Sequence, residues 1–324
     1  MRYFLIDTDT ASDDAVALIM ALRAPDVEVV AITTVAGNVG VDQATRNALY
    51  TVELCGSSAR VYQGAAEPLQ RPLQDATWFH GRDGLGDRGY APVSARPADG
   101  DAVQVILDCA AQYPDLELVT LGPLTNIARA LERRPALAQR LKRCVVMGGA
   151  PCCVGNVTPA AEYNIWTDPE AARIVLRSGL PVDLIGWHLC RGPAVLSPAD
   201  IARTLALNTD LARFAIDCNG HARQAFLEQT GEEGISLPDP VAMAIALDRT
   251  IGTSWSRHHV DVEADRELTR GMTVVDQLNV AGNQRNCGVW SHFQGRNPAT
   301  EVCWTIDVAR WKEALFRALA SAVL

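Results

Sequence analysis

The sequence of 324 residues contains no apolar run of membrane-spanning length, no low-complexity tract, no internal repeat and no linker rich in Ser, Pro or Gly. Nothing in it marks a boundary, and we expect a single domain over residues 1–324. Its start, Met1-Arg2-Tyr3, leads directly into an apolar segment without the basic and apolar regions of a secretory signal. We therefore expect a cytoplasmic protein without a membrane partner.

Positive charge is scarce, because 29 Lys and Arg residues stand against 38 Asp and Glu residues and leave a net charge of −9. Proteins that bind a phosphate backbone usually carry a basic patch, so we expect no nucleic-acid partner. The nine Cys residues show no CxxC motif paired with a second set of metal ligands, which argues against a zinc site. Their odd number also argues against a disulfide framework, and we interpret the adjacent pair Cys152-Cys153 as ordinary reduced thiols.

Four carboxylates crowd the N-terminal segment Asp7-Thr8-Asp9-Thr10-Ala11-Ser12-Asp13-Asp14. This segment lies between an apolar strand pattern at Tyr3–Ile6 and an apolar helical pattern at 15–22. Like charges at a buried strand end repel one another unless a cation or hydrogen-bond donors compensate them. Oxygen ligands without nearby His or Cys favour calcium or magnesium over zinc. The alternative is a solvated acidic helix start.

The helix is expected to begin near Ala11, with Thr10 and Asp13 forming a capping box. Its positive end would then face the carboxylates and keep Asp13 and Asp14 ionised at neutral pH.

Further along the chain, apolar runs rich in β-branched residues alternate with amphipathic helical patterns. This βαβ alternation predicts an α/β fold, with a mostly parallel, Rossmann-like central sheet flanked by helices. The expected strands are 27–35, 116–121, 144–147 and 182–185, and the expected helices include 102–112, 124–133 and 169–178.

Polar residues follow several of these strands, at the sheet edge where parallel sheets bind their ligands. Asn38 follows the strand at 27–35, and Asn156, Glu162 and Asn164 follow the strand at 144–147. Asp239 opens a later helix between two prolines, where it would serve as a further metal ligand or only as a helix cap. Amides and carboxylates beside a cation suit a polyhydroxyl substrate, so the pattern favours sugar chemistry.

The N-terminal acidic segment resembles the DxDxxxDD signature of the nucleoside hydrolases, the inosine-uridine-preferring type among them. Four further segments agree with that family in the same order along the chain, so the resemblance covers nearly all of it. They are Thr33-Thr34-Val35-Ala36-Gly37-Asn38, Leu121-Gly122-Pro123-Leu124-Thr125-Asn126-Ile127-Ala128, Gly155-Asn156-Val157-Thr158-Pro159-Ala160-Ala161-Glu162-Tyr163-Asn164 and Asp239-Pro240-Val241-Ala242.

The resemblance implies a nucleoside hydrolase fold and a Ca²⁺-dependent hydrolase that splits nucleosides into ribose and free base. It implies that Asp9, Asp14, Asp239 and the main-chain carbonyl of Leu121 bind the calcium ion, and that Asp9 takes a proton from the calcium-bound water. Asp13, Asn156, Glu162 and Asn164 would bind the ribose hydroxyls, with Asn38 close to both sugar and base. It also implies a homo-oligomer, either a dimer or a tetramer.

The sequence departs from the family in two places. Pro238 stands where inosine-uridine-preferring members carry a His, so this position has no general acid, and Thr10-Ala11-Ser12 replaces a Pro-Gly segment. His80 matches a site-facing histidine of pyrimidine-preferring members and is our candidate for assisting the leaving base. Aromatic stacking by Trp78, Trp166 or Trp187 would be another route. The preferred base is left open.

Two other classes of protein share single features with this sequence. A haloacid-dehalogenase-type phosphatase would share Asp7-Thr8-Asp9, but it expects Thr or Val where Ala11 stands, and it needs a catalytic Lys in a chain that has only Lys142 and Lys312. An EF-hand would require Gly and Glu where Ser12 and Leu18 stand. A hydrolase of a different N-riboside, or an inactive ribose- and calcium-binding member of the fold, stays open.

Overall fold

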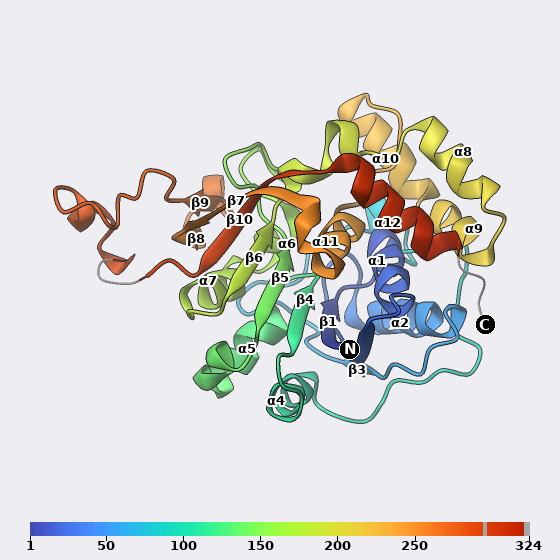
Figure 1. Ribbon diagram of the computed structural model, residues 1–324, viewed down its shortest axis with the longest axis horizontal. Helices are drawn as coiled ribbons and strands as arrows, with labels where there is room; N and C mark the ends of the chain where they lie inside the picture. The colour runs from blue at the N-terminus through green and yellow to red at the C-terminus, as the bar shows by residue number, and fades with distance from the viewer. Residues whose placement is uncertain (294–296, 321–324) are drawn as a thin grey trace.

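The computed structural model describes residues 1–293 and 297–320 and places an eight-stranded sheet between two layers of helices (Figure 1). The strand order is β3-β2-β1-β4-β5-β6-β10-β7, and all neighbours are parallel except β10 and β7. The strands are β1 (Arg2–Thr8), β2 (Val27–Thr34), β3 (Val61–Gln63), β4 (Glu117–Thr120), β5 (Arg143–Met147), β6 (Val182–Ile185), β7 (Gly252–His258) and β10 (Thr300–Ile306). The expected α/β class with a mostly parallel sheet is confirmed.

One helical layer covers the face of the sheet that packs against α1, and its side chains form a large apolar core. It contains α1 (Ser12–Leu22), α2 (Val41–Leu54), α9 (Asp210–Asp217), α11 (Pro238–Leu247) and α12 (Val308–Ala320). Because α1 is apolar on nearly all sides, it fits between the sheet, α2 and α11.

The opposite face carries a second apolar core formed by α4 (Ala102–Gln112), α5 (Thr125–Arg133) and α7 (Pro169–Arg177). Side-chain caps start two of these helices, since Asp101 accepts a hydrogen bond from Val103 N and Asp168 from Ala171 N. The remaining described α-helices are α3 (Thr77–His80), α6 (Tyr163–Thr167), α8 (Pro198–Ala206) and α10 (Gly220–Thr230). The region from α8 to α10 consists of three separate helices.

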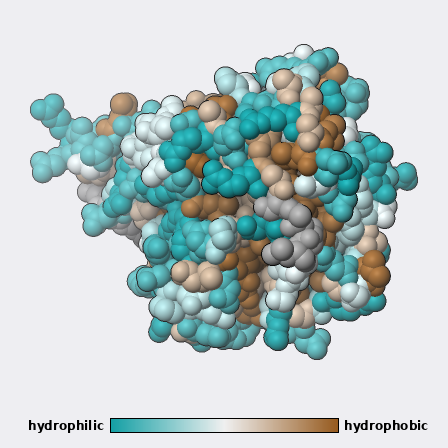
Figure 2. Space-filling model, turned by 45° about the vertical axis from the view of Figure 1, so that its right-hand side comes forward, coloured by the Kyte–Doolittle hydropathy of each residue, from teal (hydrophilic) through white to brown (hydrophobic). Residues whose placement is uncertain are grey.

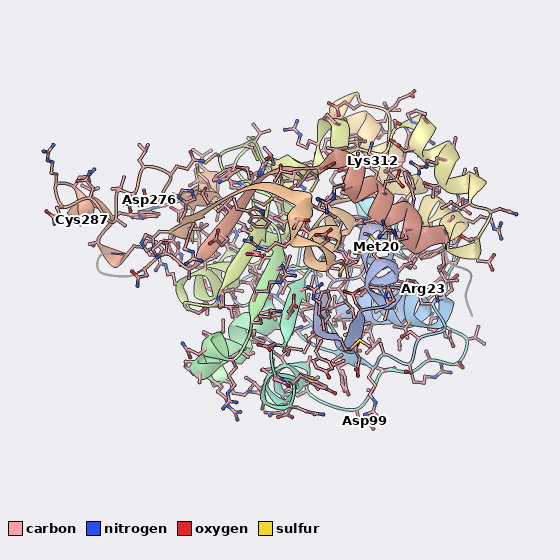
Figure 3. All side chains as sticks on the ribbon, in the orientation of Figure 1. Met20, Arg23, Asp99, Asp276, Cys287 and Lys312 are labelled. Atoms are coloured by element: carbon pink, nitrogen blue, oxygen red, sulfur yellow. The ribbon has the colours of Figure 1, made fainter. Side chains whose placement is uncertain are left out.

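A small hairpin of β8 (Val260–Val262) and β9 (Thr273–Val275) leads into an arm that projects from one end of the sheet (Figure 1). Asp276 begins the arm and accepts hydrogen bonds from Val280 N at 2.7 Å and Ala281 N at 2.9 Å (Figure 3). On the face seen in Figure 2, hydrophobic and hydrophilic residues are interspersed. In the described part of the chain, no helix combines the length and apolar content needed to cross a bilayer.

The strand order places a topological switch between β1 and β4. The chain runs from β1 outward to β2 and β3, and then returns to form β4 on the other side of β1. In open parallel sheets, the loops diverge at such a point and leave a crevice at the carboxyl ends of the strands. Asp9 follows β1 and Leu121 follows β4 at this crevice.

Candidate active site

Four buried aspartates lie at the crevice, and they come from two helices and one loop. Asp9 follows β1, Asp13 and Asp14 lie in the first turn of α1, and Asp239 lies in the first turn of α11, which packs against α1. Asp13, Asp14 and Asp239 each offer a carboxylate oxygen within 4.8 Å of the other two. The sequence prediction that Asp239 joins the N-terminal carboxylates agrees with this geometry.

Asp7, the first carboxylate of the segment, instead accepts hydrogen bonds from the side chains of Thr33 and Asn126, the latter at 2.8 Å. The pocket lining described below does not include it. The acidic segment thus contributes three of its four carboxylates to the site.

The start of α1 differs from our expectation by one residue. The capping interaction joins Ala11 and Asp14, because Asp14 Oδ2 accepts a hydrogen bond from Ala11 N at 2.9 Å. The predicted Thr10–Asp13 box is wrong, because Asp14 turns back over the helix start and also accepts from Thr8 Oγ1 at 2.6 Å. Asp13 is left to face the pocket.

Asp9 is held by close backbone on both sides. Its Oδ2 accepts a hydrogen bond from Asn38 N at 2.6 Å, while Oδ1 is buried without a partner among the described residues. A Cβ at Gly37 would lie 2.0 Å from Oδ2, and one at Gly122 would lie 2.7 Å from Oδ1. Glycine is therefore required at both positions for the backbone to pack against this carboxylate.

Burial dominates the electrostatics of the four aspartates. It raises the pKa of Asp13 to about 6 and, with the neighbouring charge of Asp14, raises the pKa of Asp9 well above its ordinary value. The pKa of Asp14 is also raised, and that of Asp239 is raised well above its ordinary value by burial and then by the other three charges. Desolvation thus raises these pKa values against the effect of the helix N-terminus, but a pKa of about 6 still leaves Asp13 largely ionised at neutral pH, as the sequence predicted.

The residues present fit a hard cation. All of the clustered groups are carboxylates, and Asp9 Oδ1 and Asp13 Oδ1 are buried without a hydrogen-bond partner in the described ranges. Carboxylate and carbonyl oxygens are the ligands that calcium and magnesium prefer. The carbonyl of Leu121, the other expected ligand, accepts a hydrogen bond from Asn164 Nδ2 at 2.7 Å and retains a second lone pair.

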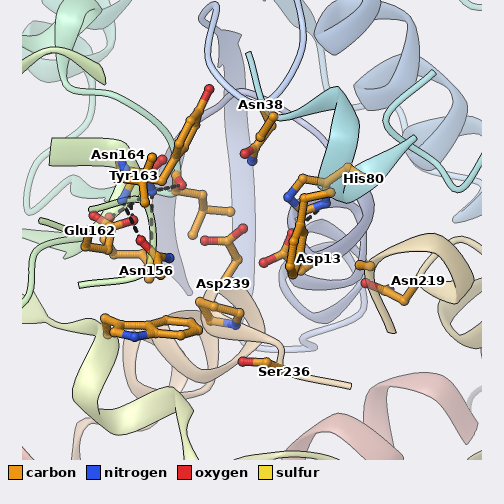
Figure 4. A pocket seen from close by; sticks show the side chains of 18 of the residues that line it. Asp13, Asn38, His80, Asn156, Glu162, Tyr163, Asn164, Asn219, Ser236 and Asp239 are labelled. Atoms are coloured by element: carbon orange, nitrogen blue, oxygen red, sulfur yellow. Dashed lines mark hydrogen bonds and ion pairs between the residues drawn. The ribbon is translucent and has the colours of Figure 1, made fainter. Parts of the chain in front are cut away.

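A pocket opens above these aspartates (Figure 4). Asn156, Glu162 and Asn164 lie on one side of it, His80 and Asn219 on the other, and Asp13 and Asp239 between them. The remaining lining includes Asn38, Leu121 and aromatic or apolar side chains such as Trp78, Phe79 and Trp187. The predicted site residues are thus brought together, and all but Asp9 and Asp14, which lie deeper, line this pocket.

Local hydrogen bonds fix the Glu162 side of the pocket. Glu162 caps α6, because its carboxylate accepts from Asn164 N at 2.9 Å and also from Gly149 N at 2.7 Å. Asn156 Oδ1 accepts from Tyr163 N at 3.0 Å, so its amide nitrogen is left for a ligand. The Tyr163 hydroxyl donates to Gly37 O at 2.8 Å and so ties α6 to the loop that holds Asp9.

His80 lies at the end of α3, buried against the start of α1. Its Nδ1 is 2.9 Å from Ser12 Oγ and 3.8 Å from Asp13 Oδ1. Burial lowers the pKa of His80 to about 4, so the imidazole is neutral at pH 7. The side chain of Trp78 is 59% exposed at the pocket rim, and Trp187 lines the pocket while Trp166 does not.

The structure adds residues that sequence reasoning missed. Phe79, Asn219, Gln229 and Ser236 line the pocket, and no sequence pattern pointed to the last three, which come from the irregular second half of the chain. Tyr163 stood inside a quoted motif, but nothing indicated its hydrogen bond to Gly37.

The two lysines and the adjacent cysteine pair lie outside the pocket lining. Lys312 pairs with Asp200 at 2.8 Å (Figure 3), and Lys142 lies 3.4 Å from Glu117, so neither lysine lines the pocket as a phosphatase would need. All nine cysteines are free thiols, and neither Cys152 nor Cys153 belongs to the pocket lining.

Comparison with known proteins relates the whole chain to one group of enzymes. The sequence model of the family described as inosine-uridine preferring nucleoside hydrolase matches residues 4–313. A probable uridine nucleosidase 1 of Oryza sativa subsp. japonica is 37% identical over 307 residues, which cover 94% of this chain and 92% of the relative. An inosine-uridine preferring nucleoside hydrolase of Leishmania major is 36% identical over 279 residues, covering 85% and 88% of the two chains.

Solved structures give the same result. A plant nucleoside hydrolase, the PpNRh1 enzyme, superposes with a TM-score of 0.91 at 29% identity over 99% of both chains. A purine-preferring ribonucleoside hydrolase from Gardnerella vaginalis superposes with a TM-score of 0.88 at 29% identity over 98% of both chains. The sheet, the helical layers and the crevice described above are therefore shared with these proteins.

Proposed function

Since this chain belongs to the inosine-uridine preferring nucleoside hydrolase family, whose members are N-glycosyl hydrolases, we propose that it is a Ca²⁺-dependent ribonucleoside hydrolase. Water and a purine or pyrimidine nucleoside would yield ribose and the free base. The observation that carries this proposal is the buried group of Asp13, Asp14 and Asp239 beside Asp9, facing a pocket lined by amides and Glu162. A carboxylate-rich cavity of this kind suits both a cation and a sugar.

Asp9, Asp14, Asp239 and the carbonyl of Leu121 would hold the calcium ion. Asp13 lies close enough to Asp14 and Asp239 to take part, although we assign it to the ribose hydroxyls. When bound, the ion supplies a Lewis acid that lowers the pKa of a water molecule and neutralises the carboxylates.

Asp9 is proposed as the general base. Its Oδ2 is fixed by Asn38 N, and its unpartnered Oδ1 can accept a proton from the attacking water. Cleavage of the glycosidic bond places positive charge on the ribose ring, and the surrounding anionic groups stabilise that charge.

Asn156, Glu162 and Asn164 would bind ribose hydroxyls on one side of the pocket, with Asn38 near the junction of sugar and base. The base would then lie toward His80 of α3, the helix that also contributes Trp78 and Phe79 to the lining. Pro238 lines the pocket but has no proton to transfer, so we assign the stabilisation of the leaving base to His80. Because burial keeps this imidazole neutral, its proposed role is to donate a hydrogen bond to the base.

The proposal is tested by measuring reducing-sugar release from inosine, adenosine, guanosine, uridine and cytidine, with and without a calcium chelator. Release that the chelator abolishes and added Ca²⁺ restores is the expected result. Asp9→Ala should retain the fold by circular dichroism and lose turnover. Absence of release from every nucleoside would instead favour a different N-riboside or an inactive binding protein. We also propose a homo-oligomer, a dimer or a tetramer, which sedimentation analysis would test.

A further inference from the structure

Asn219 has a buried polar atom that the fold does not use. It precedes α10, and its side chain is fully buried. The amide nitrogen Nδ2 donates to Ala215 O at 2.9 Å and to Ser12 O at 3.3 Å. Both partners are carbonyl oxygens that can only accept, so they fix which end of the amide is nitrogen. The oxygen Oδ1 has no hydrogen-bond partner within residues 1–293 and 297–320.

This oxygen belongs to a residue that lines the pocket, on the side opposite Asn156 and Glu162 (Figure 4). Asn219 and His80 are linked through Ser12, because Ser12 O accepts from Asn219 and Ser12 Oγ contacts His80 Nδ1. The proposed ribose ligands lie across the pocket, so a nucleoside bound to them would direct its base toward Asn219.

A buried acceptor without a donor is unfavourable, and ligand binding is the event that could supply one. Ser236, another polar residue of the lining, already donates its hydroxyl to Cys190 O at 3.0 Å. A bound nucleobase can supply the donor that Asn219 Oδ1 lacks, because it carries N–H groups along the edge that is remote from the sugar.

We propose that Asn219 is a specificity-determining residue whose Oδ1 accepts an N–H of the nucleobase, the ring N–H of uracil or hypoxanthine in the first place. The inference rests on the proposed function, because it takes the pocket to be a nucleoside site. It predicts discrimination against bases that have lost this hydrogen, since a site that leaves a buried polar group unpaired rejects such analogues strongly.

The test compares kcat/KM for uridine with that for 3-methyluridine, and for inosine with that for 1-methylinosine. Each pair differs only in the replacement of the ring N–H by N–CH₃. The wild type should prefer the N–H substrate by about 100-fold or more. Asn219→Ala removes the acceptor and leaves room for the methyl group, so the preference should fall to about tenfold or less. The same comparison of cytidine with N4,N4-dimethylcytidine tests whether Asn219 Oδ1 recognises an amino group instead of a ring N–H.

Ser236→Ala is the matched control. It removes a hydroxyl of the same pocket, but this hydroxyl already donates to Cys190 O. The preference of this variant for the N–H substrate should therefore equal that of the wild type. Failure of the wild type to hydrolyse any riboside would overturn the proposed function itself. Hydrolysis of uridine with equal rates for both members of a pair, or an Asn219→Ala ratio equal to the wild-type ratio, would overturn only the role of Asn219. If Asn219→Ala does not fold, the wild-type comparison of N–H and N–CH₃ substrates still decides, because equal rates for both members of a pair would overturn that role.

Discussion

Cation binding should stabilise this protein strongly at neutral pH and weakly at pH 5. The reason is the raised pKa of the buried aspartates. The pKa of Asp13 is about 6 in the folded protein, against an ordinary value of 3.8. An acid whose pKa is raised on folding stabilises the fold while it is protonated, and this contribution is lost as the pH rises from about 4 past 6.

The size of the effect follows from the shift. For Asp13, a difference of about two units corresponds to about 3 kcal/mol of unfolding free energy lost by pH 7 when no cation is bound. A cation favours the ionised carboxylates and removes this penalty. At a free concentration 100 times its dissociation constant, it would add about 3 kcal/mol of stability. For a chain of this size, that corresponds to a rise of about 5 °C in the melting temperature.

The assay is thermal unfolding of chelator-treated protein, with and without added CaCl₂, at pH 5 and pH 7.5. MgCl₂ and ZnCl₂ in parallel samples identify the preferred ion. Asp14→Asn should abolish the calcium-induced rise, whereas Asp42→Asn should keep it, because Asp42 lies in α2 and bonds only to Gln63 in the described hydrogen-bond network. A calcium-induced rise that is equal at both pH values, or that survives in Asp14→Asn, would refute the reasoning.

Three further predictions concern the groups that support the site. Gly37→Ala should lower kcat about 100-fold or more and should also lower the melting temperature, because its Cβ would lie 2.0 Å from the buried Asp9 Oδ2 and force this carboxylate to move. Steady-state kinetics with calorimetry would measure both effects, and an unchanged kcat would contradict the prediction. His80→Gln should lower kcat for uridine but leave the shape of the pH–rate profile near pH 6.5 unchanged, because burial lowers the pKa of His80 to about 4. An inflection at pH 6.5 that is present in the wild type and absent from the variant would contradict this. Glu117→Gln should lower the free energy of unfolding in urea by about 3 kcal/mol, because it removes the buried carboxylate that pairs with Arg2 and Arg143 and leaves Arg143 only its longer carboxylate contact, with Asp183 at 3.3 Å; unchanged stability would show that this contact and solvent compensate the two cations.

The sequence predicted those parts of the fold that are buried on both faces. The strands at 116–121, 144–147 and 182–185 are found within a residue or so of the expected bounds, because a parallel strand covered by two helical layers is largely apolar. The strands β3, β7 and β10 were missed. β3 has only three residues, and β7, which pairs antiparallel at the edge of the sheet, is largely polar. Their pairing is decided by tertiary contacts that leave little local pattern.

The candidate site was predictable where consecutive residues carry the chemistry, and less so where side chains converge from distant helices. Asp9, Asp13 and Asp14 stand together in the sequence, and Asp239 could be suspected from its place at a helix start. Asn219 could not, because an Asn before a helix is common, and only the contact of the α9–α10 turn with the start of α1 leaves its Oδ1 buried and unpaired.

Burial, more than the helix N-terminus, decides the electrostatics of Asp13 and Asp14. A helix N-terminus stabilises a carboxylate by about 1 kcal/mol or less at an exposed position. Burial of Asp13 acts in the opposite direction by about 3 kcal/mol, judged from its pKa of about 6. The helix start can be predicted from the sequence, whereas the burial cannot, because α11 packs against α1 and places Asp239 beside Asp13 and Asp14 only in the folded chain. Each added carboxylate makes the uncompensated cluster less favourable, so the same packing that destabilises four buried anions creates the affinity for a cation.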